Sequence, residues 1–240
     1  MNRQIPNIIT CCNLISGCIA TGCAFYGQYQ WAVLMIVVGA LFDFLDGLSA
    51  RFLGVSSPIG KELDSLADVV TFGVAPSSIL FYLFHEVHCP GVLLPIVKFL
   101  PYTAFLMAAF SAARLAKFNL DTRQSTQFIG LPTPANALFW GSLVLGQHAF
   151  LTSLKFNAVF LFLFMLLFCF LLVAEIPMLA LKFKTFTWRD NKVKYIFLLG
   201  ALPCFLFGYS CFAAIIVWYI ALSLLSNKLA DNQAIASSNL

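Results

Sequence analysis

Apolar runs long enough to cross a lipid bilayer follow one another along almost the whole chain. A helix needs about 20 apolar residues to span the hydrocarbon core, because each residue adds about 1.5 Å along the helix axis. The runs between charges and turn residues predict eight helices, over residues 7–25, 30–54, 61–84, 92–117, 133–150, 156–181, 194–208 and 209–226. We therefore expect an all-α, polytopic transmembrane helical bundle.

The same pattern leaves no stretch for a separate soluble domain. Charged residues make up only 10% of the 240 residues, against roughly 25% in an average soluble domain. We expect a single integral membrane domain over 1–240, with a six-helix core over 1–181, two further helices over 194–226 and an unstructured polar tail over 227–240. Pro203 and its neighbouring glycines leave two forms open for 194–226: a tight hairpin, or one broken helix with an interfacial piece.

Lysines and arginines predict the orientation of the chain in the membrane. With the N-terminus in the cytoplasm, twelve of the fourteen lie in inside segments, and only Lys98 and Lys155 lie outside. Because cytoplasmic loops carry the excess of positive charge, we expect both termini and the 55–60 link to face the cytoplasm. The net charge of +4 then reflects a basic rim against anionic membrane lipids, so no nucleic-acid partner is expected.

Half of the ten acidic residues lie in the stretch DFLDGLSARFLGVSSPIGKELDSLAD, which runs from Asp43 to Asp68. Asp43 and Asp46 share one face of the second predicted helix, because residues three or four apart are neighbours on a helix surface. Asp64 and Asp68 share one face of the third in the same way. A short link makes these helices antiparallel neighbours, so we expect the four carboxylates to converge near the cytoplasmic surface.

Converging carboxylates in a low dielectric repel one another and require cations. Oxygen ligands without histidine or cysteine nearby indicate Mg²⁺ or Mn²⁺ rather than zinc. We expect one metal ion or two, since a pair about 4 Å apart clamps the attacking and leaving oxygens in displacement at phosphorus. On spacing alone, the cation pathway of an ion-coupled transporter and a set of unrelated interfacial charges stay open.

The spacing D-x2-D-G-x2-A-R-x8-G-x3-D-x3-D resembles the signature of the CDP-alcohol phosphatidyltransferase family at all eight of its positions. Members of that family are polytopic membrane enzymes that transfer a phosphatidyl or related group from a CDP-linked lipid to an alcohol and release CMP. The resemblance implies that the 1–181 core is catalytic and that Asp68 also takes the proton of the acceptor hydroxyl. It implies metal ligation by four aspartates: Asp43, Asp46, Asp64 and Asp68.

The resemblance also implies a pocket for the CDP group. The sequence PNIIT in the first helix is similar to the family's Pro-Asn-x-x-Thr element, although these residues alone could equally mark a helix start. The planar guanidinium of Arg51 suits phosphate oxygens. Six residues are therefore expected to bind the CDP-lipid: Asn7, Thr10, Gly47, Ala50, Arg51 and Gly60.

The segment SAARLAKFNLDTRQSTQFIGLPTPANA is similar to one that the serine-transferring branch of this family carries after its fourth helix. The resemblance implies CDP-diacylglycerol and L-serine as substrates, and homodimers are common in such families. Arg114 and Lys117 would meet the serine carboxylate and Asn119 its ammonium. Lys117 stands where arginine is usual, which keeps the charge but loses the forked donor. These cations also suit a cytoplasmic rim, and glycerol phosphate or inositol phosphate stays open as the acceptor.

Two other polar features stand apart from this site. FHEVHC, with His85, Glu86, His88 and Cys89, is expected to form a solvated outside loop, because an i, i+3 histidine pair lacks a full ligand set. Glu175 precedes Pro177 near the inner end of the sixth predicted helix. It either pairs with Arg114 or a lysine of 182–194, or lies at the interface without a partner.

Overall fold

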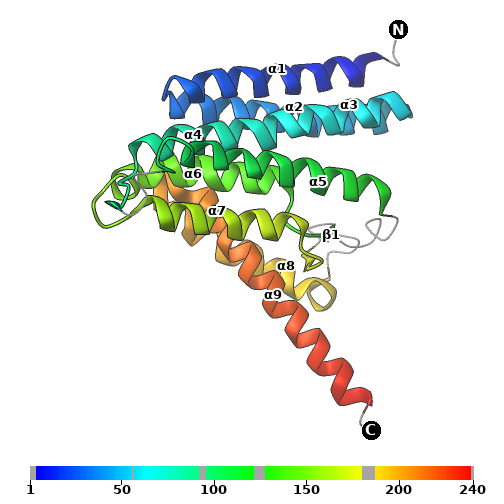
Figure 1. The fold of residues 1–240 in the computed structure, drawn as a ribbon. Coiled ribbons are helices and arrows are strands. Elements are labelled where there is room, and N and C mark those ends of the chain that lie inside the picture. The colour runs from blue at the N-terminus through cyan, green and yellow to red at the C-terminus, as the bar shows by residue number, and fades with distance from the viewer. Residues whose placement is uncertain (1–3, 56, 92–95, 122–127, 180–186, 239–240) are drawn as a thin grey trace.

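The computed structural model describes residues 4–55, 57–91, 96–121, 128–179 and 187–238, which form a bundle of helices (Figure 1). The helices are α1 (Ile5–Phe25), α2 (Tyr29–Leu53), α3 (Pro58–Asp68), α4 (Ala75–Glu86), α5 (Leu106–Leu120), α6 (Thr133–Leu151), α7 (Ala158–Val173), α8 (Trp188–Ala201) and α9 (Cys211–Ser238). A π-helix (Val69–Val74) joins α3 to α4 without a break. Two-residue strands, β1 (Phe128–Ile129) and β2 (Pro177–Met178), pair antiparallel.

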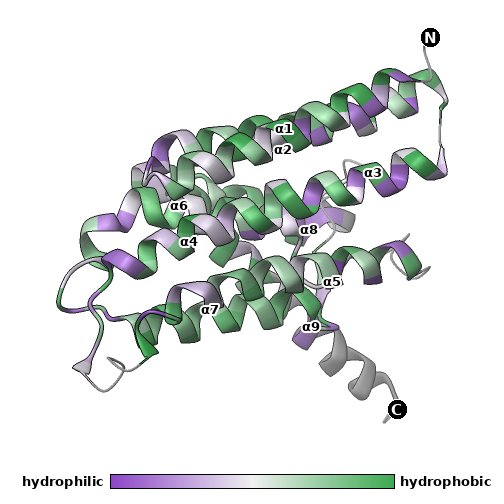
Figure 2. Ribbon diagram, turned by 45° about the horizontal axis from the view of Figure 1, so that its top comes forward, coloured by the Kyte–Doolittle hydropathy of each residue, from purple (hydrophilic) through white to green (hydrophobic). Residues whose placement is uncertain are grey.

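Within the described residues, four helical segments are long and apolar enough to cross a membrane: Ile5–Phe25, Tyr29–Leu53, Pro58–Glu86 and Pro203–Lys228. Large apolar side chains such as Ile15, Leu41 and Phe205 are exposed on their outer surfaces. Figure 2 shows hydrophobic residues dominating the middle of the bundle. Exposing so much apolar surface to water is unfavourable, so these outer surfaces are suited to contact with lipid. The prediction of an all-α membrane bundle is confirmed.

The start of α1, the end of α2, the start of α3 and the C-terminal end of α5 lie at one end of the bundle, and α4 ends at the other (Figure 1). These helix ends, which flank segments predicted to lie inside, therefore share one end of the molecule. The assignment of that end to the cytoplasm stays a prediction. Lys182 and Lys184, which also support it, lie outside the described residues.

The helices predicted over 92–117 and 156–181 lose part of one end in the structure, and proline explains both differences. The helix predicted over 92–117 begins with a 3-10 segment at Leu100 and becomes α-helical at Leu106, because Pro101 lacks an N–H and is tolerated only in a first turn. The helix predicted over 156–181 ends at Val173, and Ala174 is extended. Pro177 belongs to β2, and a proline disfavours helix in the residue before it.

The C-terminal region is a pair of packed helices joined by a 3-10 segment (Pro203–Ser210), with Gly208 at a φ of +57°. The indole Nε1 of Trp218 on α9 donates to the carbonyl of Phe197 on α8 at 3.3 Å. Residues 227–238, where we expected an unstructured tail, continue α9 as helix. This stretch contains neither proline nor glycine, so a helix already formed extends through it at little cost.

α1 packs closely against the π-helix, and this packing brings Asn13 of α1 and Thr71 of the π-helix together. A Cβ on Gly17 would lie 2.7 Å from the Cα of Thr71, so only glycine allows this approach. The Thr71 hydroxyl donates to the carbonyl of Asn13 on α1 at 3.0 Å. The apolar core lies further along the bundle, where Phe139 of α6 stacks on Phe168 of α7 at 4.1 Å.

Candidate active site

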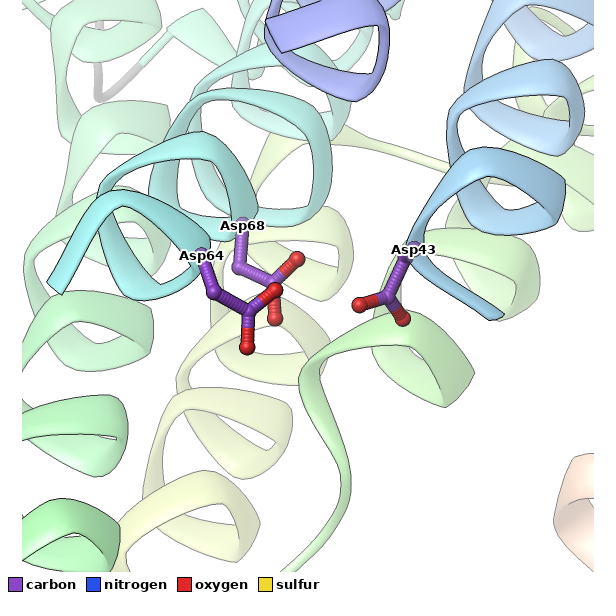
Figure 3. A group of neighbouring side chains, drawn as sticks. All are labelled: Asp43, Asp64 and Asp68. Carbon is purple, nitrogen blue, oxygen red and sulfur yellow. The ribbon is translucent and has the colours of Figure 1, made fainter. Parts of the chain in front are cut away.

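Three aspartates from two helices converge at one end of the bundle. Carboxylate oxygens of Asp43 on α2 and of Asp64 and Asp68 on α3 all lie within 4.8 Å of one another. Figure 3 shows Asp64 and Asp68 projecting from successive turns of α3 toward Asp43 on the facing helix. This is the convergence that the helical spacing predicted, for three of its four carboxylates.

Asp46, the fourth predicted ligand, lies beside this group and faces α1. Its side chain is 5% exposed, and Oδ2 accepts a 2.6 Å hydrogen bond from the Thr10 hydroxyl. It also lines a cavity next to the three aspartates. The structure thus brings Asp43, Asp64 and Asp68 together and leaves Asp46 between them and Thr10.

Asp68 is oriented by a residue that the sequence analysis missed. The side-chain amide of Asn13, which is fully buried on α1, donates to Oδ1 of Asp68 at 3.2 Å. The π-helix that begins directly after Asp68 supplies Thr71, which holds the Asn13 carbonyl. Such π-helical turns are frequent at functional sites. A polar residue inside the apolar 7–25 run was the available signal for Asn13.

The donor set of the aspartate cluster fits a hard divalent cation. Oδ1 of Asp64 is buried and has no hydrogen-bond partner among the described residues. An unpaired buried carboxylate oxygen is costly, and three carboxylates this close repel one another. A divalent ion bound by oxygen ligands removes both costs, so these residues could bind Mg²⁺ or Mn²⁺.

A cavity of about 230 Å³ adjoins the cluster between α1, α2 and α3. Five of the six residues predicted to bind the CDP-lipid line it: Asn7, Thr10, Gly47, Ala50 and Gly60. A Cβ on Gly60 would lie 3.1 Å from Oδ1 of Asn7, so glycine keeps this space open. Ser57 caps the start of α3 by accepting a 3.0 Å hydrogen bond from the Gly60 N–H.

The cation that lines this cavity is Lys61 rather than Arg51. Arg51 is exposed, and its Nε donates to the carbonyl of Gly47 at 3.0 Å. Lys61 lines the cavity and donates to the Asn119 carbonyl at 3.1 Å. The sequence analysis had used Lys61 only to orient the chain, although its place directly after Gly60 in the signature stretch could have indicated it.

A second cavity, of about 300 Å³, lies between the end of α5 and the end of α7. Arg114 and Lys117, two of the three residues predicted to bind the acceptor, line it. Asn119 is directed elsewhere: its amide donates to the Ser65 hydroxyl at 2.7 Å and ties α5 to α3. Glu175, which follows α7 instead of lying within it, lines the same cavity as Arg114.

The FHEVHC stretch includes the end of α4, which lies at the opposite end of the bundle from the start of α3 (Figure 1). His85 and Glu86 form the last turn of α4, so the expected loop begins only after them. The Glu86 carboxylate accepts from the Tyr29 hydroxyl at 2.5 Å and lies 3.0 Å from Nε2 of His148. Among the described residues, the only grouping of three or more acidic, histidine or cysteine side chains suited to a metal is the aspartate cluster.

Comparison with known proteins agrees with this fold and site, which define a helical membrane enzyme with an acidic centre beside a polar cavity. The family model described as CDP-alcohol phosphatidyltransferase matches residues 3–207. The chain belongs to the CDP-alcohol phosphatidyltransferase family, which is a family of phosphotransferases.

Several curated relatives carry the name CDP-diacylglycerol–serine O-phosphatidyltransferase. The Bacillus subtilis (strain 168) protein is 39% identical over 132 residues, which cover 55% of this chain and 70% of that protein. The Helicobacter pylori (strain J99) protein is 38% identical over 136 residues, covering 55% of this chain and 54% of that protein. The Methanocaldococcus jannaschii protein is 32% identical over 155 residues, 65% of each chain. The match thus spans about half to two thirds of these relatives.

Proposed function

We propose that this protein transfers the phosphatidyl group of CDP-diacylglycerol to the hydroxyl of L-serine, giving phosphatidylserine and CMP. The observation that carries the proposal is the convergence of Asp43, Asp64 and Asp68 beside the 230 Å³ cavity, which Asp64 lines. Membership of the CDP-alcohol phosphatidyltransferase family and the shared name of its relatives support the same reaction.

In this proposal the CDP group occupies the 230 Å³ cavity, with Lys61 against the diphosphate. Thr10 ties α1 to α2 through Asp46 and so keeps the wall of this cavity in place. The four aspartates would hold one or two Mg²⁺ or Mn²⁺ ions: Asp43, Asp46, Asp64 and Asp68. A bound divalent ion supplies neutralisation of negative charge on the diphosphate and on the departing phosphate.

Asp68 is the proposed general base. The Asn13 amide occupies Oδ1 of Asp68, which leaves Oδ2 to accept the proton of the serine hydroxyl. The serine oxygen then attacks the phosphorus that carries the diacylglycerol. The bond from that phosphorus to the bridging diphosphate oxygen breaks, and CMP departs.

The serine carboxylate is proposed to bind Arg114 and Lys117 in the 300 Å³ cavity. Arg114 is 8% exposed, and its helix, α5, packs against the π-helix that begins directly after Asp68. A serine held there by its carboxylate would therefore lie on the Asp68 side of α5. We propose further that this end of the bundle faces the cytoplasm, where L-serine is available. A homodimer stays a prediction.

The proposal is tested by incubating the purified protein with CDP-diacylglycerol, Mg²⁺ or Mn²⁺ and labelled L-serine. We expect CMP release together with labelled phosphatidylserine. CMP release with glycerol phosphate or inositol phosphate, but not with serine, would overturn the acceptor while keeping the chemistry of the family. Solute counterflow in liposomes without CMP formation would instead support a transporter.

Replacing Lys61 by methionine should raise the KM for CDP-diacylglycerol about tenfold, because a charge-assisted contact to phosphate is lost. The inhibition constant of CMP should rise as well, while the KM for serine stays unchanged. Lys98→Met is the matched control, because Lys98 is an exposed lysine in a turn well away from the cavity. An unchanged KM for the CDP-lipid would contradict this role of Lys61.

A further inference from the structure

We infer that Glu175 binds the ammonium group of the acceptor and so makes the protein selective for an amino-acid alcohol. This inference rests on the proposed function and deepens it, because it concerns the acceptor cavity alone. Its basis is the 300 Å³ cavity, which carries positive side chains on one wall and a carboxylate on another.

The positive side chains come from α5, and carboxylates come from two places: Asp121, which directly follows α5, also lines the cavity, and Glu175 comes later in the sequence, after α7. Arg114 and Lys117 lie on successive turns of α5, whereas Glu175 lies in the segment between α7 and β2. A ligand with a carboxylate at one end and an ammonium at the other complements both walls. An acceptor that brings a phosphate instead would meet the Glu175 carboxylate as a like charge. The cavity therefore discriminates by repulsion as well as by attraction.

Arg114 has hydrogen-bonding capacity to offer such a ligand. Its Nε is buried without a hydrogen-bond partner among the described residues, and its contact to the Thr133 hydroxyl is long, at 3.5 Å. The guanidinium carbon lies 5.3 Å from the ring centre of Phe118, which holds the group in place through its flat face. A buried guanidinium N–H without a hydrogen-bond partner is costly. A carboxylate that accepts a hydrogen bond from it therefore gains binding free energy.

Glu175 is positioned by the segment of β1, Gly130 and Leu131, which comes after α5 in the chain. The Gly130 N–H donates to the Ile176 carbonyl and the Leu131 N–H to the Leu171 carbonyl, each at 2.9 Å. These bonds fix the chain on both sides of Glu175. Gly130 has a φ of +75°, and a Cβ there would lie 2.6 Å from the Leu172 carbonyl oxygen, so the clamp requires glycine.

This clamp also accounts for a motif that the proposed chemistry does not use. The β1–β2 pairing sets Ile129 opposite Pro177, directly after Glu175 and Ile176. The sequence FIGLP thus holds the end of α7 against α5, and its Ile129 also lines the cavity. The clamp brings Glu175 to the cavity of Arg114, which Asp121 at the end of α5 also lines.

The test compares L-serine with 3-hydroxypropanoate, which has the same hydroxyl and carboxylate but no ammonium. For Glu175→Gln we expect the KM for serine to rise about tenfold, since a contact between charges is lost. The inhibition constant of 3-hydroxypropanoate against serine should stay the same or fall, and the KM for CDP-diacylglycerol should not change. Glu175→Asp, which keeps the charge on a shorter stem, should recover part of the affinity for serine.

Glu62→Gln is the matched control, because it removes an exposed carboxylate from α3 and lines neither cavity. Equal changes in the constants for serine and 3-hydroxypropanoate would assign Glu175 a structural role and overturn the inference. An unchanged KM for serine would overturn it too. Failure of the unmodified protein to make phosphatidylserine would be a separate result, which contradicts the proposed function itself.

Discussion

Replacing Asp68 by asparagine is expected to reduce phosphatidyl transfer about a thousandfold while the protein stays folded. The substitution removes the proposed base, and a positioned base contributes about 10²- to 10⁴-fold to the rate of a reaction. Asparagine has nearly the same shape, and its side chain can still bond the Asn13 amide that holds Asp68 in place. The rate of CMP release with saturating serine measures the effect.

Binding of the CDP-lipid separates this loss of chemistry from a loss of the site. Asp68 does not line the 230 Å³ cavity, so the Asp68→Asn protein should still bind CDP-diacylglycerol with much of its normal affinity. Glu62→Gln, on the same helix and exposed, should retain full activity. Activity of the Asp68→Asn protein within tenfold of normal would contradict the assignment of the base.

Removing the divalent metal with EDTA should abolish activity, and adding Mn²⁺ should restore it. The same metal should raise the thermal stability, because a ligand that binds only the folded state stabilises it by about 2.7 kcal/mol at 100 times its Kd.

Replacing Asp64 by asparagine should change the thermal stability in the absence of metal. Without metal the variant should melt at a higher temperature than the normal protein, since one of three carboxylates within 4.8 Å has lost its charge.

The Asp64→Asn protein should also lose most of its response to the metal. Titration with Mn²⁺ followed by electron paramagnetic resonance should show at least tenfold weaker binding, and activity should fall at least a hundredfold. These readouts are independent of one another, so a weakened catalyst with normal Mn²⁺ binding would remove Asp64 from the metal site. Glu62→Gln serves again as the control for the loss of one negative charge from α3.

The sequence predicted the aspartate site well because helical spacing is a local property. Asp64 and Asp68 lie four residues apart on one helix, and a short link returns the chain from Asp43, so proximity follows from the sequence alone. The residues that support them could not be found in this way. Asn13 reaches Asp68 across 55 residues of sequence, through the packing of α1 against the end of α3.

The sequence predicted the acceptor region less well than the aspartate site. Its similarity to known sequences indicated Arg114, Lys117 and Asn119 together, but they lie on a helix whose faces point to different neighbours. Asn119 meets Ser65 on α3, whereas Arg114 lines the cavity near α7. The sequence singled out Glu175 and left two roles open, but it placed Glu175 inside a helix over 156–181, because the true end of that helix at Val173 depends on a proline and on pairing with a distant strand.

The sequence by itself determined that this chain is a membrane-spanning helical bundle, that its acidic stretch forms one site, and which family it resembles. These features depend on hydrophobic length, helical periodicity and motif spacing, all of which are written along the chain. Only the tertiary structure decided that Asn13 orients Asp68, that Lys61 rather than Arg51 lines the 230 Å³ cavity, and that Glu175 lines the same cavity as Arg114. Each of these depends on contacts between helices far apart in sequence, and no local pattern encodes which faces of those helices meet.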